Sequence, residues 1–276
     1  MSEREAAKVS IGEVAWLVGQ LDEVVGAAVK SASARTNGGK DIDSWQVPAE
    51  RIAYAATDVL AAKALVEYAQ EAEAAGVESG LLVDEAAVYA GEFATRLTAQ
   101  LISAGGDFDL PAGLFERTLG SPYTVARIRS FACENRIRAI GRQVAAQRGA
   151  HNAWLPEEDV VMVRDSVRSF AQKEVAPIAE RIHRHDELIP ESLIRAMADM
   201  GYFGMSAPEE YGGLGLTDFR YEQILIEETA WYGDPCFFHT LHSRLVAPYF
   251  GHFGTEEQKK RFLPRFVSGE SILAIA

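Results

Sequence analysis

The sequence has 276 residues, is 48% hydrophobic, and carries 27 basic against 40 acidic residues, a formal net charge of −13 at pH 7. This length and hydrophobic content suffice for two ordinary domains, each with its own core. So large an acidic excess repels a phosphate backbone and an anionic membrane surface alike, which excludes nucleic acid and membranes as expected partners.

Cysteine usage and the N-terminus favour a cytoplasmic protein. Cys133 and Cys236 are the only cysteines, and neither has a second cysteine nearby. Neither a disulfide framework nor a CxxC metal site is therefore expected. Met1-Ser-Glu-Arg-Glu is charged where a signal peptide needs an apolar core, and no stretch approaches the roughly 20 apolar residues of a membrane span.

The first half of the chain predicts an antiparallel bundle of helices. A polar run with paired glycines, residues 31–43, separates a leading helix from the rest. Long helices are then predicted at about 48–75, 83–102 and 123–147, from their apolar periodicity and from the glycines that follow the first two. The basic face of the last helix is expected to be solvated and consists of Arg127, Arg129, Arg136, Arg138 and Arg142.

The second half predicts a further helical domain, so the expected division is 1–150 and 151–276, with a linker at 145–152. Its first helix opens at Leu155 with a proline and three carboxylates in the first turn and is expected to end at Pro177. Further helices are predicted at about 190–200, 217–231, 235–253 and 255–267. The fold class is therefore all-α, and Ile272-Leu-Ala-Ile-Ala predicts only the start of a β-strand that has no partner in the sequence.

Three motifs suggest chemistry, and each has a structural alternative. Tyr211-Gly-Gly-Leu-Gly-Leu lacks the spacing, the preceding strand and the lysine of a phosphate-binding loop, which favours a tight helix connection. His239 and His242 are spaced to share a helix face, but a zinc site needs a third ligand and a second shell, so packing or pocket lining is favoured and no metal is predicted. Glu227 and Glu228 point about 100° apart on a helix, so at most one faces inward.

Five phrases, in order from Leu155 onward, resemble the N-terminal helical domain of the acyl-CoA dehydrogenases. They are the opening helix through Phe170-Ala-Gln-Lys-Glu-Val-Ala-Pro; Met200-Gly-Tyr-Phe-Gly-Met-Ser-Ala-Pro-Glu-Glu-Tyr-Gly-Gly-Leu-Gly-Leu; Ile226-Glu-Glu-Thr-Ala; Phe253-Gly-Thr-Glu-Glu-Gln-Lys-Lys-Arg-Phe-Leu-Pro; and Ser268-Gly-Glu. Their spacing over about 120 residues is specific to that family.

The resemblance implies FAD as cofactor and an acyl-CoA thioester as substrate. In that family the flavin ring rests against a β-domain, a glutamate of a C-terminal bundle removes the α-proton, and flavin N5 takes the β-hydride. The resemblance places Ile275 and Ala276 at the edge of the flavin-binding segment. It places Phe238, His239 and His242 on the helix that lines the acyl pocket. Because the β-domain would follow Ala276, we expect an incomplete site and an isolated chain without activity.

Residues 48–147 more weakly resemble the family's C-terminal bundle. The phrase that carries this resemblance is Glu85-Ala-Ala-Val-Tyr-Ala-Gly-Glu-Phe-Ala-Thr-Arg, with paired glycines at 105 and 106. Where many members have a Tyr-Glu-Gly-Thr phrase with the catalytic base, this sequence has Phe131-Ala-Cys-Glu-Asn and lacks the glycine and threonine. Glu134 is thus a candidate base by position, whereas charge patterning favours a solvated residue.

The sequence therefore predicts the N-terminal portion of a fused acyl-CoA dehydrogenase, an oxidoreductase of fatty acid metabolism. One alternative is a catalytically silent helical scaffold that serves a partner carrying a β-domain, and another is part of a related flavin monooxygenase. The expected assembly is a homo-oligomer or a complex with such a partner. An unpaired strand at Ile272-Leu-Ala-Ile-Ala would also promote association.

Overall fold

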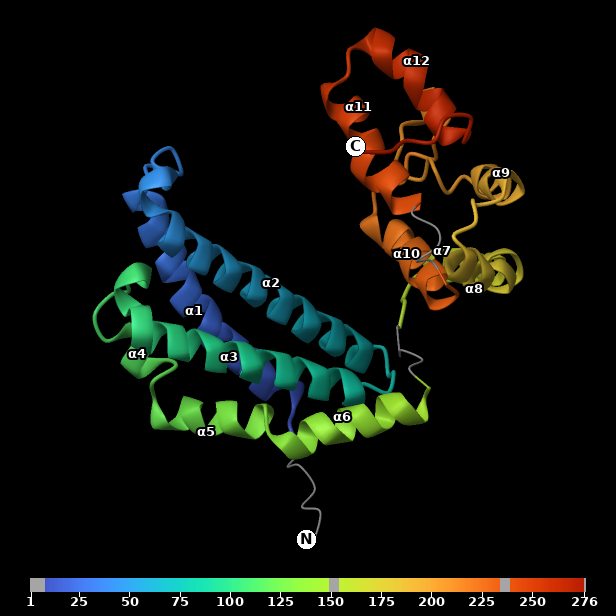
Figure 1. Cartoon of the computed structure of the whole chain (residues 1–276). Helices are drawn as coiled ribbons and strands as arrows, with labels where there is room; N and C mark the ends of the chain where they lie inside the picture. The colour runs from blue at the N-terminus through green and yellow to red at the C-terminus, as the bar shows by residue number, and fades with distance from the viewer. Residues whose placement is uncertain (1–7, 149–153, 234–238, 276) are drawn as a thin grey trace. The chain divides into compact units, whose positions relative to one another are not determined.

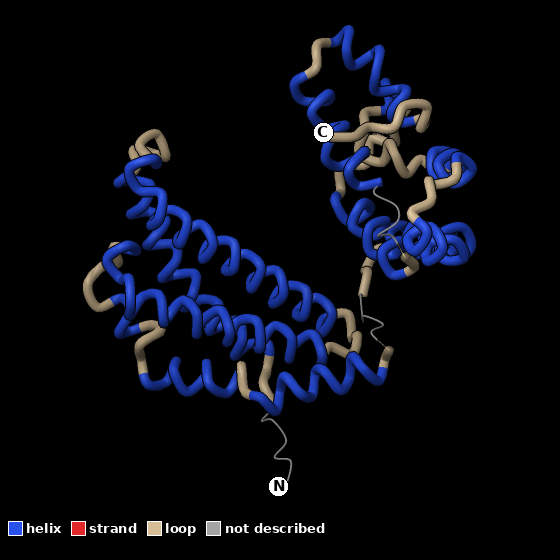
Figure 2. Tube along the Cα trace, viewed as in Figure 1, coloured by secondary structure: helices blue, strands red, loops and turns tan. Residues whose placement is uncertain are grey.

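The computed structural model describes residues 8–148, 154–233 and 239–275, which form helices and loops without a strand (Figure 2). The chain divides into two compact units, residues 1–153 and 154–276. This is the predicted all-α fold class. None of the helices in the described ranges is long and apolar enough to cross a membrane.

The first unit is built on three long helices, α1 (Ile11–Arg35), α2 (Gln46–Ala74) and α3 (Gly80–Phe108). Figure 1 shows them running alongside one another, with α5 (Pro122–Phe131) and α6 (Glu134–Ala146) laid end to end along α3. A single 3-10 turn (Ile42–Trp45) and the one-turn helix α4 (Leu114–Arg117) complete this unit within the described residues.

A narrow line of buried residues, which we call the seam, explains how α2 packs between its neighbours. Its buried residues recur at intervals of three and four, with β-branched side chains alternating with alanine: Ile52, Ala55, Val59, Ala62, Val66 and Ala69. That spacing keeps a narrow apolar line on one side of a helix, and the alanines allow neighbouring backbones to approach closely. Leu60, outside the seam, is 66% exposed.

The single helix predicted at 123–147 is two helices, and the prediction was wrong on this point. α5 ends at the fully buried Phe131, and Cys133 has extended backbone angles before α6 begins. The break lies against Gly91 of α3, where an added Cβ would come within 2.9 Å of the Ala132 backbone nitrogen. Close contact with α3 therefore fixes the position of the break, which helical periodicity does not reveal.

The basic face predicted to be solvated departs from that prediction at two residues: Arg127 is half-buried and pairs with Glu13, and Arg136 is buried. Arg136 is only 2% exposed and forms an ion pair with Asp84 at the start of α3, whereas Arg129, Arg138 and Arg142 are exposed. A buried guanidinium requires a charged partner because desolvation of an isolated charge is costly. Asp84 supplies that partner from another helix, so sequence spacing within α6 does not indicate it.

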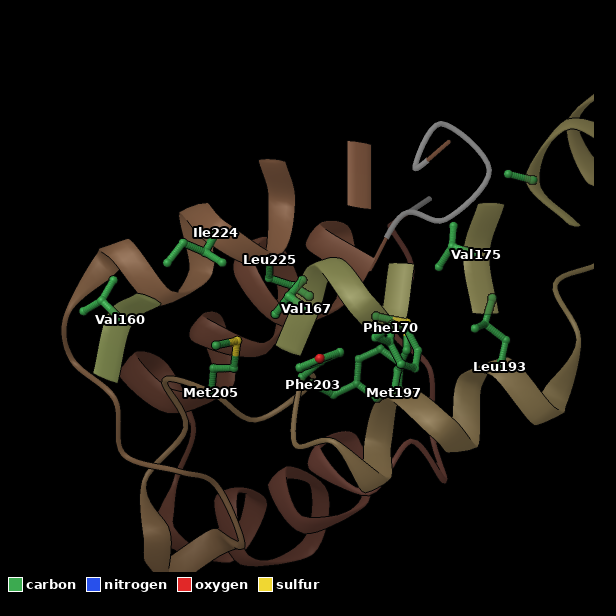
Figure 3. Close-up of a cluster of buried hydrophobic side chains, with 12 residues drawn as sticks. Val160, Val167, Phe170, Val175, Leu193, Met197, Phe203, Met205, Ile224 and Leu225 are labelled. Carbon is green, nitrogen blue, oxygen red and sulfur yellow. The ribbon is translucent and has the colours of Figure 1, made fainter. Parts of the chain in front are cut away.

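The larger of two hydrophobic clusters in the described part of the second unit is drawn in Figure 3. Side chains of α7 (Glu158–Phe170), α9 (Glu191–Asp199) and α10 (Phe219–Trp231) meet there with the loop 202–205. Phe170 and Tyr202 pack edge to face, with ring centroids 5.3 Å apart. The labelled members are Val160, Val167, Phe170, Val175, Leu193, Met197, Phe203, Met205, Ile224 and Leu225.

Proline does not end the first helix of this unit, contrary to the prediction at Pro177. A π-turn (Ala171–Val175) follows α7, and α8 (Ala176–His185) continues through the proline. In this turn Ala176 N–H donates to Ala171 O, five residues back. In a regular helix a proline ring collides with the carbonyl four residues earlier, and the wider turn relieves that collision.

The same arrangement occurs a second time. The π-turn Leu241–Val246 precedes α11 (Ala247–Phe253), which has Pro248 in its first turn. Val-Ala-Pro occurs at both places, at residues 175–177 and 246–248. The helix predicted at about 235–253 is described from His239 onward, since 235–238 lie outside the described residues.

The glycine-rich turn is a compact connection, as predicted. Leu214 N–H donates to Gly204 O and Leu216 N–H to Met205 O, which folds the segment back on itself. A Cβ at Gly213 would collide with Ala207 O, so the two sides of this loop can approach each other only with glycine present. Gly204 in turn lies against Val267 of α12 (Glu256–Val267).

The segment that follows α12 is irregular. Residues 272–275 form no strand, because a strand requires a ladder partner and no residue in the described ranges supplies one. Ile272 and Ile275 are 52% and 58% exposed, while Leu273 packs against Tyr211, Leu263 and Phe266. Within residues 272–275, Leu273 is therefore the residue that packs against the second unit.

Replacing Gly91 with alanine should destabilise the protein by about 1–3 kcal/mol, because the new methyl group has no space against Ala132. Gly141→Ala is the matched control, since a Cβ there meets nothing within 4 Å. It should stabilise the protein by about 0.5–1 kcal/mol through the loss of backbone freedom in the unfolded chain. Urea unfolding followed by circular dichroism measures both, and equal stabilities for the two variants would contradict the predicted contact.

Candidate functional site

The buried polar side chains of the second unit gather on two neighbouring elements. Glu222 and Thr229 lie on α10, and His239, His242 and Ser243 lie on or just before the π-turn Leu241–Val246. Each is at most 7% exposed. Burying a polar group costs free energy unless the group is hydrogen-bonded. Several buried polar side chains close together are therefore a candidate functional site. We call His239, His242 and Ser243 the histidine cluster.

Local helical geometry brings the histidine cluster together. His239 and His242 are three residues apart and thus share one side of the helix. Ser243 Oγ donates to the carbonyl of His239 over 2.9 Å, one helical turn back. This bond satisfies a buried hydroxyl locally and leaves both imidazole rings available for other contacts.

His242 joins three parts of the unit. Its Nδ1 accepts a hydrogen bond from Leu273 N–H at 3.0 Å, and its Nε2 lies 3.0 Å from Phe266 O. A backbone N–H can only donate and a carbonyl can only accept, so Nδ1 carries no hydrogen and Nε2 carries one. The ring is therefore neutral, and its two partners determine the tautomer.

Aromatic rings enclose the His242 ring. Phe203 lies edge to face with it, with centroids 4.9 Å apart, and Phe266 lies at 6.1 Å. Burial lowers the pKa of His242 below its usual 6.5; the Phe266 carbonyl acts in the opposite direction, and His239 lowers it further. At neutral pH the side chain is thus an uncharged hydrogen-bonding group within an aromatic wall.

Two ion pairs support the elements around the cluster. Glu222 on α10 pairs with Arg244 of the π-turn, Nε to Oε2 at 3.3 Å, and the Arg244 guanidinium lies 4.5 Å from the Phe219 ring centroid. Arg168 of α7 binds both carboxylate oxygens of Glu228, at 2.9 and 2.7 Å. Glu227 is exposed, so only one residue of the Glu227-Glu228 pair is turned toward the unit, as expected.

The structure brings together only some of the residues that the sequence assigned to a site. His239 and His242 are buried side by side, and Ile275 lies in the segment that His242 holds. Phe238 and Ala276 lie outside the described residues. Glu134 belongs to the first unit, where its side chain is 75% exposed and pairs with Arg138. The site assignments remain predictions.

A metal centre finds no support in the parts of the chain that the structure describes. No group of three or more histidine, cysteine, aspartate or glutamate side chains there is arranged to hold a metal ion. The two ring nitrogens of His242 are both engaged with backbone groups.

Sequence reasoning missed Glu222, Phe203 and Phe266 as neighbours of the cluster. Glu222 had a usable signal, because it stands three residues before Leu225 and thus on the same side of the helix, and it is 4% exposed in the structure. The two phenylalanines come from a loop and from α12, and only the folded chain places them beside His242.

Comparison with known families supplies the identity of this unit. Residues 157–270 match the family model described as acyl-CoA dehydrogenase, N-terminal domain. This segment belongs to the acyl-CoA dehydrogenase family. The matched range of this acyl-CoA dehydrogenase domain contains α7 to α12, the glycine-rich connection and the histidine cluster.

Individual relatives agree with the family model. The chain is 36% identical over 157 residues to (2S)-methylsuccinyl-CoA dehydrogenase of Cereibacter sphaeroides, an alignment that covers 55% of this chain and 28% of that protein. It is 33% identical over 115 residues to 3-(aryl)acrylate reductase of Clostridium sporogenes, covering 42% of this chain and 30% of that protein. A crystal structure of acyl-CoA dehydrogenase from Geobacillus kaustophilus is 35% identical, with a TM-score of 0.40 over 44% of this chain and 31% of that one. The chain thus spans less than a third of the length of these relatives.

Lowering the pH should destabilise the domain through His242. Because its folded pKa lies below the usual 6.5, the unfolded chain binds more protons between these two values. The free energy of unfolding should therefore be unaffected by this group above pH 6.5 and should fall as the pH drops toward the folded pKa, with a slope of at most about 1.4 kcal/mol per pH unit.

Urea unfolding across a pH series measures this effect, and His242→Gln is the comparison. Glutamine retains one acceptor and one donor but does not titrate in this range. The variant should show a flatter pH dependence than the wild type. An identical pH dependence in the two proteins would show that His242 is not the titrating group.

Proposed function

We propose that this chain supplies the N-terminal helical domain of a flavin-dependent acyl-CoA dehydrogenase, which introduces an α,β double bond into an acyl-CoA thioester. The observation that carries this proposal is the family match over residues 157–270. The buried aromatic and histidine surroundings of His242 support it, because an acyl chain needs an apolar wall with few polar groups.

The chain's own residues would shape the acyl pocket and exclude water from it. In the proposal, His239, His242 and Phe238 line it, as the resemblance implies. Since both ring nitrogens of His242 bind backbone groups, its contribution is the face of a neutral ring and not a proton. The Glu222–Arg244 pair would keep the π-turn in place and so hold the histidine cluster against α10.

The terminal segment offers a fit for one part of FAD. Ile272 and Ile275 are more than half exposed and present apolar side chains of the kind that pack against a flat aromatic ring. No side chain from Ile272 to Ile275 is charged, so these residues suit the edge of the ring and not the diphosphate. We assign Ile275, with Ala276 beside it, to the ring edge. When bound, FAD would accept the hydride from the substrate's β-carbon.

Desaturation is the direction we propose. A relative at 36% identity is a dehydrogenase, and one at 33% is named as a reductase of an aryl acrylate, which is the opposite direction on a similar bond. The dehydrogenase alignment is both longer and more similar, which favours oxidation. We assign no base to the described part of the second unit, and the exposed, ion-paired Glu134 does not have the buried surroundings of one.

A chimaeric enzyme tests the proposal. Residues 157–276 of this chain, which include Ile275 and Ala276, would replace the corresponding segment of (2S)-methylsuccinyl-CoA dehydrogenase from Cereibacter sphaeroides, with the unaltered enzyme as control. The chimaera should purify with flavin and lose the absorbance of oxidised flavin when an acyl-CoA substrate is added without oxygen. A panel of acyl-CoA thioesters would show which acyl group the grafted pocket accepts.

Two outcomes would contradict this proposal. A folded chimaera without flavin would contradict the cofactor assignment. A folded, flavin-loaded chimaera that no acyl-CoA reduces would contradict the substrate assignment. Circular dichroism and thermal unfolding establish that the chimaera is folded before either conclusion is drawn.

A further inference from the structure

Within residues 271–275, the backbone N–H groups of Ser271 and Leu273 donate hydrogen bonds to different acceptors. Ser271 N–H donates to Arg265 O at 3.0 Å, within the same stretch of chain. Leu273 N–H donates to Nδ1 of His242 at 3.0 Å, and His242 is 31 residues earlier in the sequence. The second bond is therefore the one that fixes the segment relative to another element.

Three contacts fix the position of His242 Nδ1. On its opposite edge, the His242 ring bonds Phe266 O in the last turn of α12, where helix carbonyls lack partners within the helix. Phe203 packs against the ring at 71° and Phe266 at 80°, which holds the ring plane. A ring held in this way presents Nδ1 in one direction, toward Leu273.

The geometry points to His242 as a positioning residue for residues 271–275. We propose that its Nδ1, anchored through Nε2 to the end of α12, holds the Leu273 backbone and so determines where Ile275 lies. This inference rests on the proposed function only in its last step, where Ile275 faces the edge of the flavin ring. His242 itself would touch neither the cofactor nor the reacting atoms through a hydrogen bond.

Packing alone is the competing explanation, and it makes a different prediction. If His242 only filled space, a phenylalanine of similar size would hold the segment equally well. If Nδ1 is the anchor, phenylalanine releases Leu273 N–H but leaves Ser271 N–H bonded to Arg265 O. Glutamine, which offers an acceptor and a donor, should restore part of the attachment.

Amide hydrogen exchange in the 276-residue chain, followed by nuclear magnetic resonance, tests this inference. In His242→Phe, the Leu273 amide should exchange about tenfold faster than in the wild type, as expected for the loss of one hydrogen bond. The Ser271 amide should keep its wild-type rate, and His242→Gln should slow Leu273 again. Ser243→Ala is the matched control, because it alters the same π-turn without touching the ring, and it should leave Leu273 unchanged.

A second measurement needs no variant. The imidazole nitrogen signals of His242 in the wild type should show a protonated Nε2 and an unprotonated Nδ1. The inference fails if Nδ1 carries the proton, if Leu273 exchanges at the wild-type rate in His242→Phe, or if Ser271 and Leu273 lose protection equally. These measurements involve no flavin, so they can succeed while the chimaera fails, and the reverse also holds.

Discussion

The second unit depends on a constraint that two prolines impose on continuous helices. Pro177 and Pro248 each follow a Val-Ala pair, and in both places the helix widens into a π-turn before the proline. The wider turn removes the collision that would otherwise break the helix. One such turn carries Val175 into the hydrophobic cluster, and the other carries His242 and Ser243 into buried positions. Each π-turn thus places at least one buried side chain of the second unit.

The two units are stabilised differently. In the first, buried alanines of α2 and α3 and Gly91 allow close backbone approach between larger buried side chains such as Phe93 and Phe108. In the second, aromatic rings such as Phe170, Tyr202 and Phe266 fill the interior. A close backbone contact tolerates little added volume. The buried His242 lies among the aromatic rings of the second unit.

The sequence predicted the helices where periodicity was uninterrupted, and it failed where a contact between distant residues decided the outcome. The break at Ala132 depends on α3, and the burial of Arg136 depends on Asp84. The prediction that a helix ends at Pro177 was wrong because a proline usually ends a helix, and hydrophobic periodicity does not indicate a π-turn. For the site, the spacing of His239 and His242 was visible, but Phe203, Phe266 and the Leu273 amide reach His242 only after folding. The chemistry assigned to these residues came from family resemblance, which spacing alone does not supply.

The π-turns also affect how this chain can be aligned and altered. Each adds the equivalent of one residue to a helix, and one residue corresponds to a rotation of about 100° around the helix axis. A relative that lacked the extra residue at 241–246 would differ by a one-residue gap while keeping the same fold on either side. Deleting a residue there would rotate one side of the helix relative to the other. Either His242 would turn away from Leu273, or the whole of α11 would turn. The length of this turn therefore determines which helix face is directed toward Leu273, independent of which side chains the turn carries.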